Sequence, residues 1–112
     1  MSQITTHILD TTKGKPVAGV TIILYRGEND EWTELKSGKT NNDGRITDLL
    51  AKDDVLQIGI YKLRFETKDY FDQVQTPTFY PFVEIVFDFQ SSEHYHIPLL
   101  LNPFGYTTYR GS

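Results

Sequence analysis

The sequence predicts an all-β protein, a two-sheet antiparallel β-sandwich of seven to eight strands with one short helix. Several short segments alternate between apolar and polar residues with the period of two that is typical of strands. Clusters rich in Gly, Pro, Asn and Asp separate these segments, at the spacing of roughly 8–12 residues found in sandwiches. A single segment has a helical pattern. Two packed sheets in one domain covering residues 1–112 are therefore expected.

The first three strands are expected at residues 4–10, 20–25 and 32–36. Residues 4–10 are rich in β-branched side chains and end at the break formed by residues 13–16. Residues 20–25 are nearly all apolar, which predicts a strand buried on both faces. The polar residues that follow then return the chain into the third strand as a meander.

A turn at residues 40–45 is expected to position an arginine. Its Asp43-Gly44 pair favours positive φ angles, and Arg45 follows at the start of a short strand. Arg45 should therefore project from a rim of the sandwich.

Residues 58–66 alternate clearly, which predicts one buried face and one solvated face. Tyr61 and Leu63 belong to the apolar face, whereas Lys62 and Arg64 belong to the face expected to be wet.

The helix is expected directly after this strand, followed by another strand at residues 82–89. Thr67 is the predicted N-cap, and Pro77 ends the helical pattern. Residues 82–89 return to a period of two.

The last nineteen residues predict a hairpin that extends to the C-terminus. The turn is at residues 102–105, where Pro stands second and Gly fourth. In the strand before it, His94 and His96 share one face because side chains alternate in direction. The tail that follows contains Tyr, Arg and Ser, and we expect it to be held in place.

Composition excludes several classes of function. The chain has 112 residues, a formal net charge of −4 and no cysteine. No basic cluster suits a nucleic-acid backbone or an anionic membrane surface, and no segment reads as a spanning helix or a signal peptide. Without cysteine, disulfides and thiolate metal sites are excluded and a reducing compartment is permitted. We expect a cytoplasmic protein that binds a small polar molecule, with neither nucleic-acid nor membrane partners.

Motifs spread from end to end resemble those of 5-hydroxyisourate hydrolases in the transthyretin-like protein family. The matching segments are residues 5–10 (TTHILD), 14–16 (GKP), 40–45 (TNNDGR), 79–81 (FYP), 94–101 (HYHIPLLL) and 109–112 (YRGS). The closing YRGS is the most specific of these, because transthyretins proper share the sandwich but lack this ending and the histidines. Asn102 stands in the turn where many relatives have Ser, and this departure affects no functional position.

The resemblance implies a transthyretin-like β-sandwich assembled as a homotetramer, with active sites at the dimer-dimer interface. It also implies hydrolysis of the cyclic amide of 5-hydroxyisourate, giving 2-oxo-4-hydroxy-4-carboxy-5-ureidoimidazoline in urate (purine) degradation, without a cofactor or metal. By the same resemblance, His7, Arg45 and His96 fall on catalytic positions. Tyr109 and Ser112 join His7 and Arg45 as substrate-binding residues.

The chemistry of these side chains suits that reaction. Opening an amide with water requires a base, donors for the oxyanion and a proton for the leaving nitrogen. His7 and His96 can take and return a proton near neutral pH, and either could be the base. Arg45 offers a planar, permanently charged fork for carbonyl and anionic oxygens. Tyr109 and Ser112 could contribute hydroxyl groups.

Two alternatives remain open from the sequence. His7, His94 and His96 are the chain's three histidines and could form the site of a zinc-dependent amidohydrolase. A transthyretin-like carrier of an aromatic small molecule would have the same sandwich but would favour an apolar lining. The presence of two histidines and an arginine favours the hydrolase.

Overall fold

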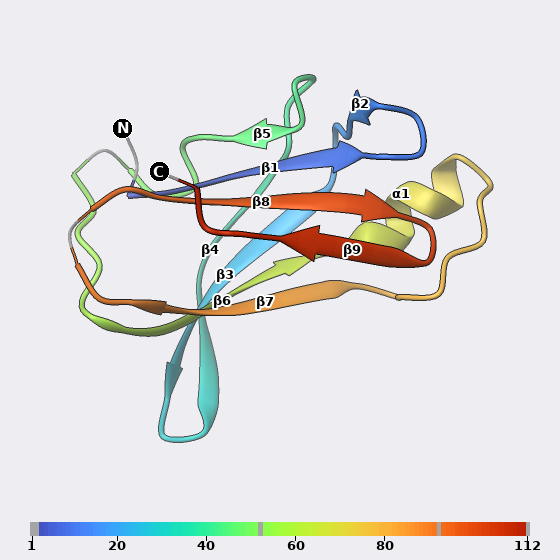
Figure 1. The fold of residues 1–112 in the computed structure, drawn as a ribbon. Helices are drawn as coiled ribbons and strands as arrows, with labels where there is room; N and C mark the ends of the chain where they lie inside the picture. The colour runs from blue at the N-terminus through green and yellow to red at the C-terminus, as the bar shows by residue number, and fades with distance from the viewer. Residues whose placement is uncertain (1–2, 52, 92, 112) are drawn as a thin grey trace.

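The computed structural model describes residues 3–51, 53–91 and 93–111, and it confirms the two-sheet sandwich (Figure 1). The first sheet contains β1 (Ile4–Asp10), β2 (Lys15–Pro16), β5 (Arg45–Ile46), β8 (Tyr95–Asn102) and β9 (Gly105–Thr108). The second sheet contains β3 (Thr21–Glu28), β4 (Glu31–Lys39), β6 (Gly59–Phe65) and β7 (Val83–Phe89). Helix α1 (Thr67–Gln73) follows β6. The described ranges thus hold nine strands rather than seven or eight, because β2 is a two-residue strand where the sequence indicated only a break.

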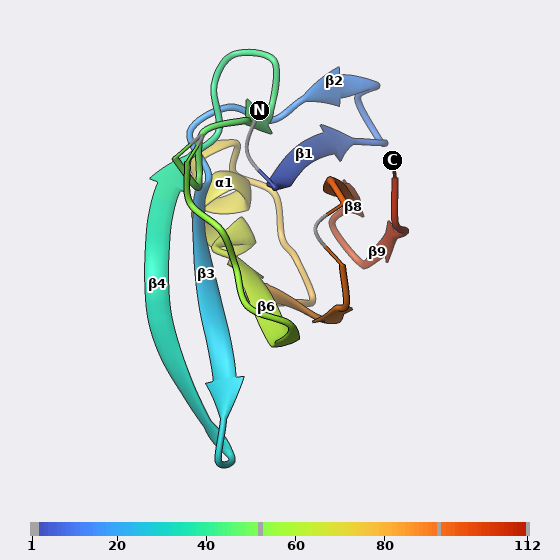
Figure 2. The ribbon, with the colours of Figure 1, turned by 90° about the vertical axis from the view of Figure 1, so that its left-hand side faces the viewer.

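Strands β7 and β9 are edge strands of their sheets, as β2 and β4 are at the opposite edges. The first sheet has the order β2-β1-β8-β9, with β5 also paired to β1, and the second has the order β4-β3-β6-β7. Figure 2 shows the sheets as two layers, with β3, β4 and β6 on one side and β1, β8 and β9 on the other. Strands β7 and β9 each have a described neighbour on one side only.

The core lies between the sheets and follows the alternation in the sequence. Apolar side chains at every second position are buried, and their neighbours point outward. The core-forming residues of the longer strands include Ile4, Ile8, Ile22, Leu24, Tyr61, Leu63, Phe65, Val83, Phe89, Ile97, Leu99 and Leu101. Strand β3 is buried on one face only, since Ile23 between Ile22 and Leu24 is half-buried. The prediction of burial on both faces of this segment was therefore wrong.

One strand pair departs from the expected antiparallel arrangement. Strands β1 and β8 run parallel, with Thr5 in register with His96 and His7 in register with Pro98. The other pairs between the strands are antiparallel. A parallel pair needs a long connection, and here the whole of the second sheet lies between β1 and β8 in the chain.

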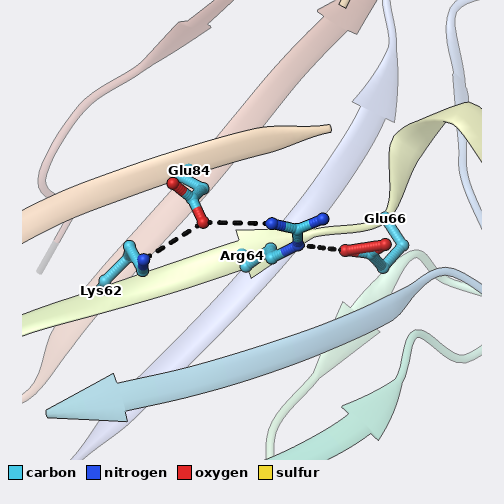
Figure 3. A network of polar contacts seen from close by, with 4 residues as sticks. All are labelled: Lys62, Arg64, Glu66 and Glu84. Carbon is cyan, nitrogen blue, oxygen red and sulfur yellow. Dashed lines mark hydrogen bonds and ion pairs between the residues drawn. The ribbon is translucent and has the colours of Figure 1, made fainter. Parts of the chain in front are cut away.

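The outward face of β6 is less exposed than the sequence suggests, and its charged side chains join a network of ion pairs (Figure 3). Lys62 is 9% exposed, and its ammonium lies 3.2 Å from Glu84 and 4.4 Å from the centre of the Trp32 ring. Arg64 bridges Glu84 and Glu66. The Trp32 ring on β4 covers the Lys62 side chain, so a cation-π contact and an ion pair with Glu84 replace the solvent expected there.

Helix α1 begins one residue earlier than predicted. Glu66 is the N-cap, and Thr67 is already helical, with a buried hydroxyl that has no hydrogen-bond partner among the described residues. Phe71 anchors the helix in the core. Tyr70 donates a hydrogen bond of 2.6 Å to Asp10 at the end of β1, which ties the helix to the first sheet. At seven residues, this helix falls far short of the length needed to span a bilayer, and no described helix can do so.

Candidate active site

His7 and His96 lie beside each other on the outward face of the first sheet. Their neighbours Ile8 and Ile97 point into the core, so alternation directs both imidazoles away from it. The ring centroids are 6.4 Å apart with an interplanar angle of 25°. Both residues are half-buried. The parallel pairing of β1 and β8 thus unites two histidines from opposite ends of the chain.

Arg45 joins the two histidines because β5 pairs with β1, which places Arg45 in register with His7. The preceding turn fixes this register. The Asn41 side chain accepts hydrogen bonds from the backbone N–H groups of Asp43 and Arg45, at 2.9 and 3.0 Å. Gly44 has a φ of 72°, and its carbonyl accepts a 2.8 Å bond from the N–H of Ile8. We call His7, Arg45 and His96 the His–Arg cluster.

The environment of the His–Arg cluster favours neutral imidazoles. Burial of the ring, and next the positive charge of Arg45, hold the pKa of His7 below its ordinary value of 6.5. Burial is also the largest cause lowering the pKa of His96, followed by Arg45 and then the other two histidines. Near neutral pH, both imidazoles therefore have a nitrogen lone pair beside a permanent cation, so the cluster can accept a proton and bind an electron-rich oxygen.

Thr5 and His94 complete the surroundings of His96. The Thr5 hydroxyl oxygen lies 2.8 Å from Nδ1 of His96 and 2.9 Å from Nε2 of His94. Thr5 was not predicted as a site residue, although its position on the same strand face two residues before His7 was a usable signal. Within the described ranges, no three histidine, aspartate or glutamate side chains form a group that could hold a metal ion. The nitrogens of His94 and His96 face one hydroxyl instead, so this geometry does not support the three-histidine zinc alternative.

The C-terminal tail approaches His96 through its backbone. Strand β9 ends at Thr108 rather than continuing to the C-terminus as predicted. Gly111 then pairs with His96 by two backbone hydrogen bonds, of 2.6 and 3.2 Å. The predicted substrate-binding Ser112 lies outside the described residues. The exposed ring of Tyr109 lines an apolar recess between β7 and β9, and no described contact joins it to the His–Arg cluster.

Comparison with known proteins decides the family. The model of the HIUase/Transthyretin family matches residues 4–111. The chain belongs to this family. This confirms the transthyretin-like resemblance inferred from the sequence motifs.

Family members similar to this chain include hydrolases and transthyretins. The mouse protein named 5-hydroxyisourate hydrolase is 44% identical over 99% of this chain and 96% of its own length. The structure of Klebsiella pneumoniae 5-hydroxyisourate hydrolase superposes with a TM-score of 0.85 at 37% identity, covering 97% of this chain and 98% of that one. Sea bream transthyretin in complex with thyroxine gives a TM-score of 0.90 at 32% identity, covering 98% and 95% of the two chains. The family fold therefore occurs in both an enzyme and a binding protein.

Proposed function

We propose that this protein is a 5-hydroxyisourate hydrolase that opens the cyclic amide of its substrate with water. The observation that carries the proposal is the placement of two imidazoles beside a guanidinium on one sheet face of this family's fold, where burial and the guanidinium charge lower both imidazole pKa values. Relatives with the hydrolase name match the chain over nearly its whole length. The hydrolase function predicted from the sequence agrees with both findings.

The His–Arg cluster supplies the groups that the reaction needs. One imidazole takes a proton from water as the water oxygen attacks the amide carbon, and a histidine returns a proton to the departing ring nitrogen. Arg45 orients the substrate and donates hydrogen bonds to the oxyanion that forms on the carbonyl oxygen. No organic cofactor takes part in this proposal. Tyr109 and Ser112 are proposed to bind substrate from the tail that Gly111 holds beside His96.

We further propose a homotetramer whose dimer-dimer interface encloses the active sites. The His–Arg cluster lies on an outward sheet face, where a facing copy could exclude bulk water from it. A second contact is available at the exposed edges of β7 and β9, which flank the apolar recess lined by Ile85, Phe87, Tyr95, Ile97 and Tyr109. Sedimentation of the purified protein tests the assembly. The expected cytoplasmic location stays a prediction, which cell fractionation can test.

The activity test uses freshly generated 5-hydroxyisourate and follows its absorbance, corrected for spontaneous decay. The wild-type protein should accelerate the decay, and His7→Asn and His96→Asn should each lower kcat by roughly 10²- to 10⁴-fold. Lys68→Ala, which removes an exposed ion pair on α1, is the control and should retain full activity.

A carrier function is the second candidate, because the sea bream structure holds thyroxine in a closely similar fold. The polar His–Arg cluster argues against it, since a carrier of an aromatic ligand gains little from two imidazoles and a guanidinium there. Absence of any acceleration by the wild-type protein, together with saturable thyroxine binding, would favour the carrier.

A further inference from the structure

The hydroxyl of Thr5 connects His96 on β8 with His94, which lies directly before this strand. Its oxygen lies 2.8 Å from His96 Nδ1 and 2.9 Å from His94 Nε2, both within hydrogen-bond distance. Thr5 is in register with His96 and is only 5% exposed, so the two imidazoles cover it on the outward face of the sheet. This contact is therefore a shielded bridge between the rings.

The number of protons on this bridge restricts the tautomers of both rings. A threonine hydroxyl has one hydrogen to donate, so at most one of the two facing nitrogens can accept it, and the other must donate its own N–H. If both nitrogens donated to Thr5, its hydrogen would be left without a described acceptor in a buried place, at a cost of about 1–3 kcal/mol. The favoured states therefore have one ring as donor and the other as acceptor.

The charge of Arg45 favours one of these two states. Because Nδ1 of His96 faces Thr5, Nε2 is the ring nitrogen left for a ligand at the His–Arg cluster. A neutral imidazole has its negative end at the unprotonated nitrogen, and the guanidinium of Arg45 attracts that end. His96 then donates from Nδ1 to Thr5, and Thr5 donates to Nε2 of His94.

We propose that Thr5 and His94 are positioning residues that hold His96 in the tautomer with a free Nε2, which makes His96 rather than His7 the general base. The proposal rests on the hydrolase function proposed above, because it assigns a role within that reaction. As Nε2 takes the proton from water, Nδ1 keeps its hydrogen bond to Thr5, so the bridge is unchanged while the ring becomes positively charged. The His96 imidazolium then gives this proton to the leaving nitrogen, which restores the neutral ring.

Two pairs of variants separate this role from a structural one. Thr5→Val has nearly the same shape but no hydroxyl, whereas Thr5→Ser keeps the hydroxyl. His94→Leu removes the acceptor for the hydroxyl hydrogen, whereas His94→Gln keeps an acceptor oxygen at similar reach. Thr5→Val and His94→Leu should lower kcat by about 10- to 100-fold with little change in KM, because a wrong tautomer affects the chemical step rather than substrate binding. Thr5→Ser and His94→Gln should restore kcat to within a few fold of wild type.

The tautomer itself can be read without substrate by ¹⁵N NMR of the imidazole nitrogens in the full-length protein. We expect wild-type His96 to have its proton on Nδ1 and to lose this preference in Thr5→Val. Wild-type His96 with its proton on Nε2, or Thr5→Val with wild-type kcat, would overturn the proposal. A wild-type protein without activity would instead refute the hydrolase function, while the NMR result would still decide whether the bridge sets the tautomer.

Discussion

Replacing Arg45 tests the electrostatics of the site most directly. Arg45→Gln removes a positive charge that lowers the pKa values of both His7 and His96, and it also removes the planar donor fork. Arg45→Lys is the matched variant, since it keeps the charge and removes only the fork. Arg45 is exposed and pairs with β1 through its backbone, so both variants should retain the wild-type fold.

The donor fork and the positive charge of Arg45 predict separate effects, the first on kcat and the second on the pH dependence of kcat/KM. Loss of one positioned donor to an oxyanion lowers kcat by about 10²- to 10³-fold, or about 2.7–4 kcal/mol, and we expect this in Arg45→Gln. Removing the charge also raises both imidazole pKa values toward the ordinary value. Because the neutral ring is the reactive form, the acid limb of kcat/KM should move to higher pH in Arg45→Gln. In Arg45→Lys, the limb should stay near its wild-type position.

The assay is the initial rate of 5-hydroxyisourate loss from about pH 5 to about pH 9 at constant ionic strength, with the uncatalysed decay subtracted at each pH. The wild-type limb should lie below pH 6.5, since both pKa values are lowered from that value, and the rate should fall about tenfold per pH unit below it. An acid limb at the same or lower pH in Arg45→Gln would show that the titrating group does not face Arg45. That result would refute the assignment of the His–Arg cluster as the active site.

Four further outcomes are expected. Gly44→Ala should lower the free energy of unfolding in urea by at least about 2 kcal/mol. The reasons are the φ of 72° and the new Cβ, which would lie 2.5 Å from the Ile8 carbonyl oxygen. Wild-type stability of this variant would contradict the geometry of the turn. Tyr70→Phe should cost about 1.5–3 kcal/mol at neutral pH by removing the hydrogen bond to Asp10. Burial, then that bond, raises the pKa of Tyr70 to about 12, so the stability difference should narrow as the pH rises from 10 toward 12, and a constant difference would count against the bond. Deleting residues 109–112 should lower kcat by roughly 10²-fold, because the pairing with the His96 backbone is lost. The circular dichroism spectrum should remain that of the folded sandwich. Full activity of the truncated protein would show that the tail takes no part in catalysis. Dialysis against a chelator should leave kcat unchanged, whereas loss of activity restored by zinc would revive the metal alternative.

Local patterns in the sequence were sufficient for most of the fold. The alternation in residues 58–66 predicted β6, because side chains alternate between the two faces of a strand. The Asp43-Gly44 pair predicted the turn into β5, because glycine readily adopts the positive φ found at Gly44. The N-cap of α1 was misplaced by one residue. Both Glu66 and Thr67 are polar, and local preference did not show that the core would bury the Thr67 hydroxyl.

Contacts between distant segments could not be read from local patterns. The solvated face assigned to Lys62 was wrong because Trp32, on a different strand, covers it. The placement of His7 and His96 in one catalytic site came from the family resemblance, since periodicity within a strand says nothing about which strand will lie beside it. The Thr5 bridge depends on the parallel register of β1 and β8, which joins residues 91 positions apart.

The pairing of the first long strand with β8 also has a consequence during biosynthesis. While the ribosome is still adding the second sheet, β1 has no β8 to pair with and presents an open hydrogen-bonding edge. The His–Arg cluster cannot assemble until β8 has emerged, so translation products that end before β8 are expected to be inactive and prone to aggregate. Pairing between strands as far apart in the chain as β1 and β8 also slows folding, which makes the newly released chain a candidate client for chaperones.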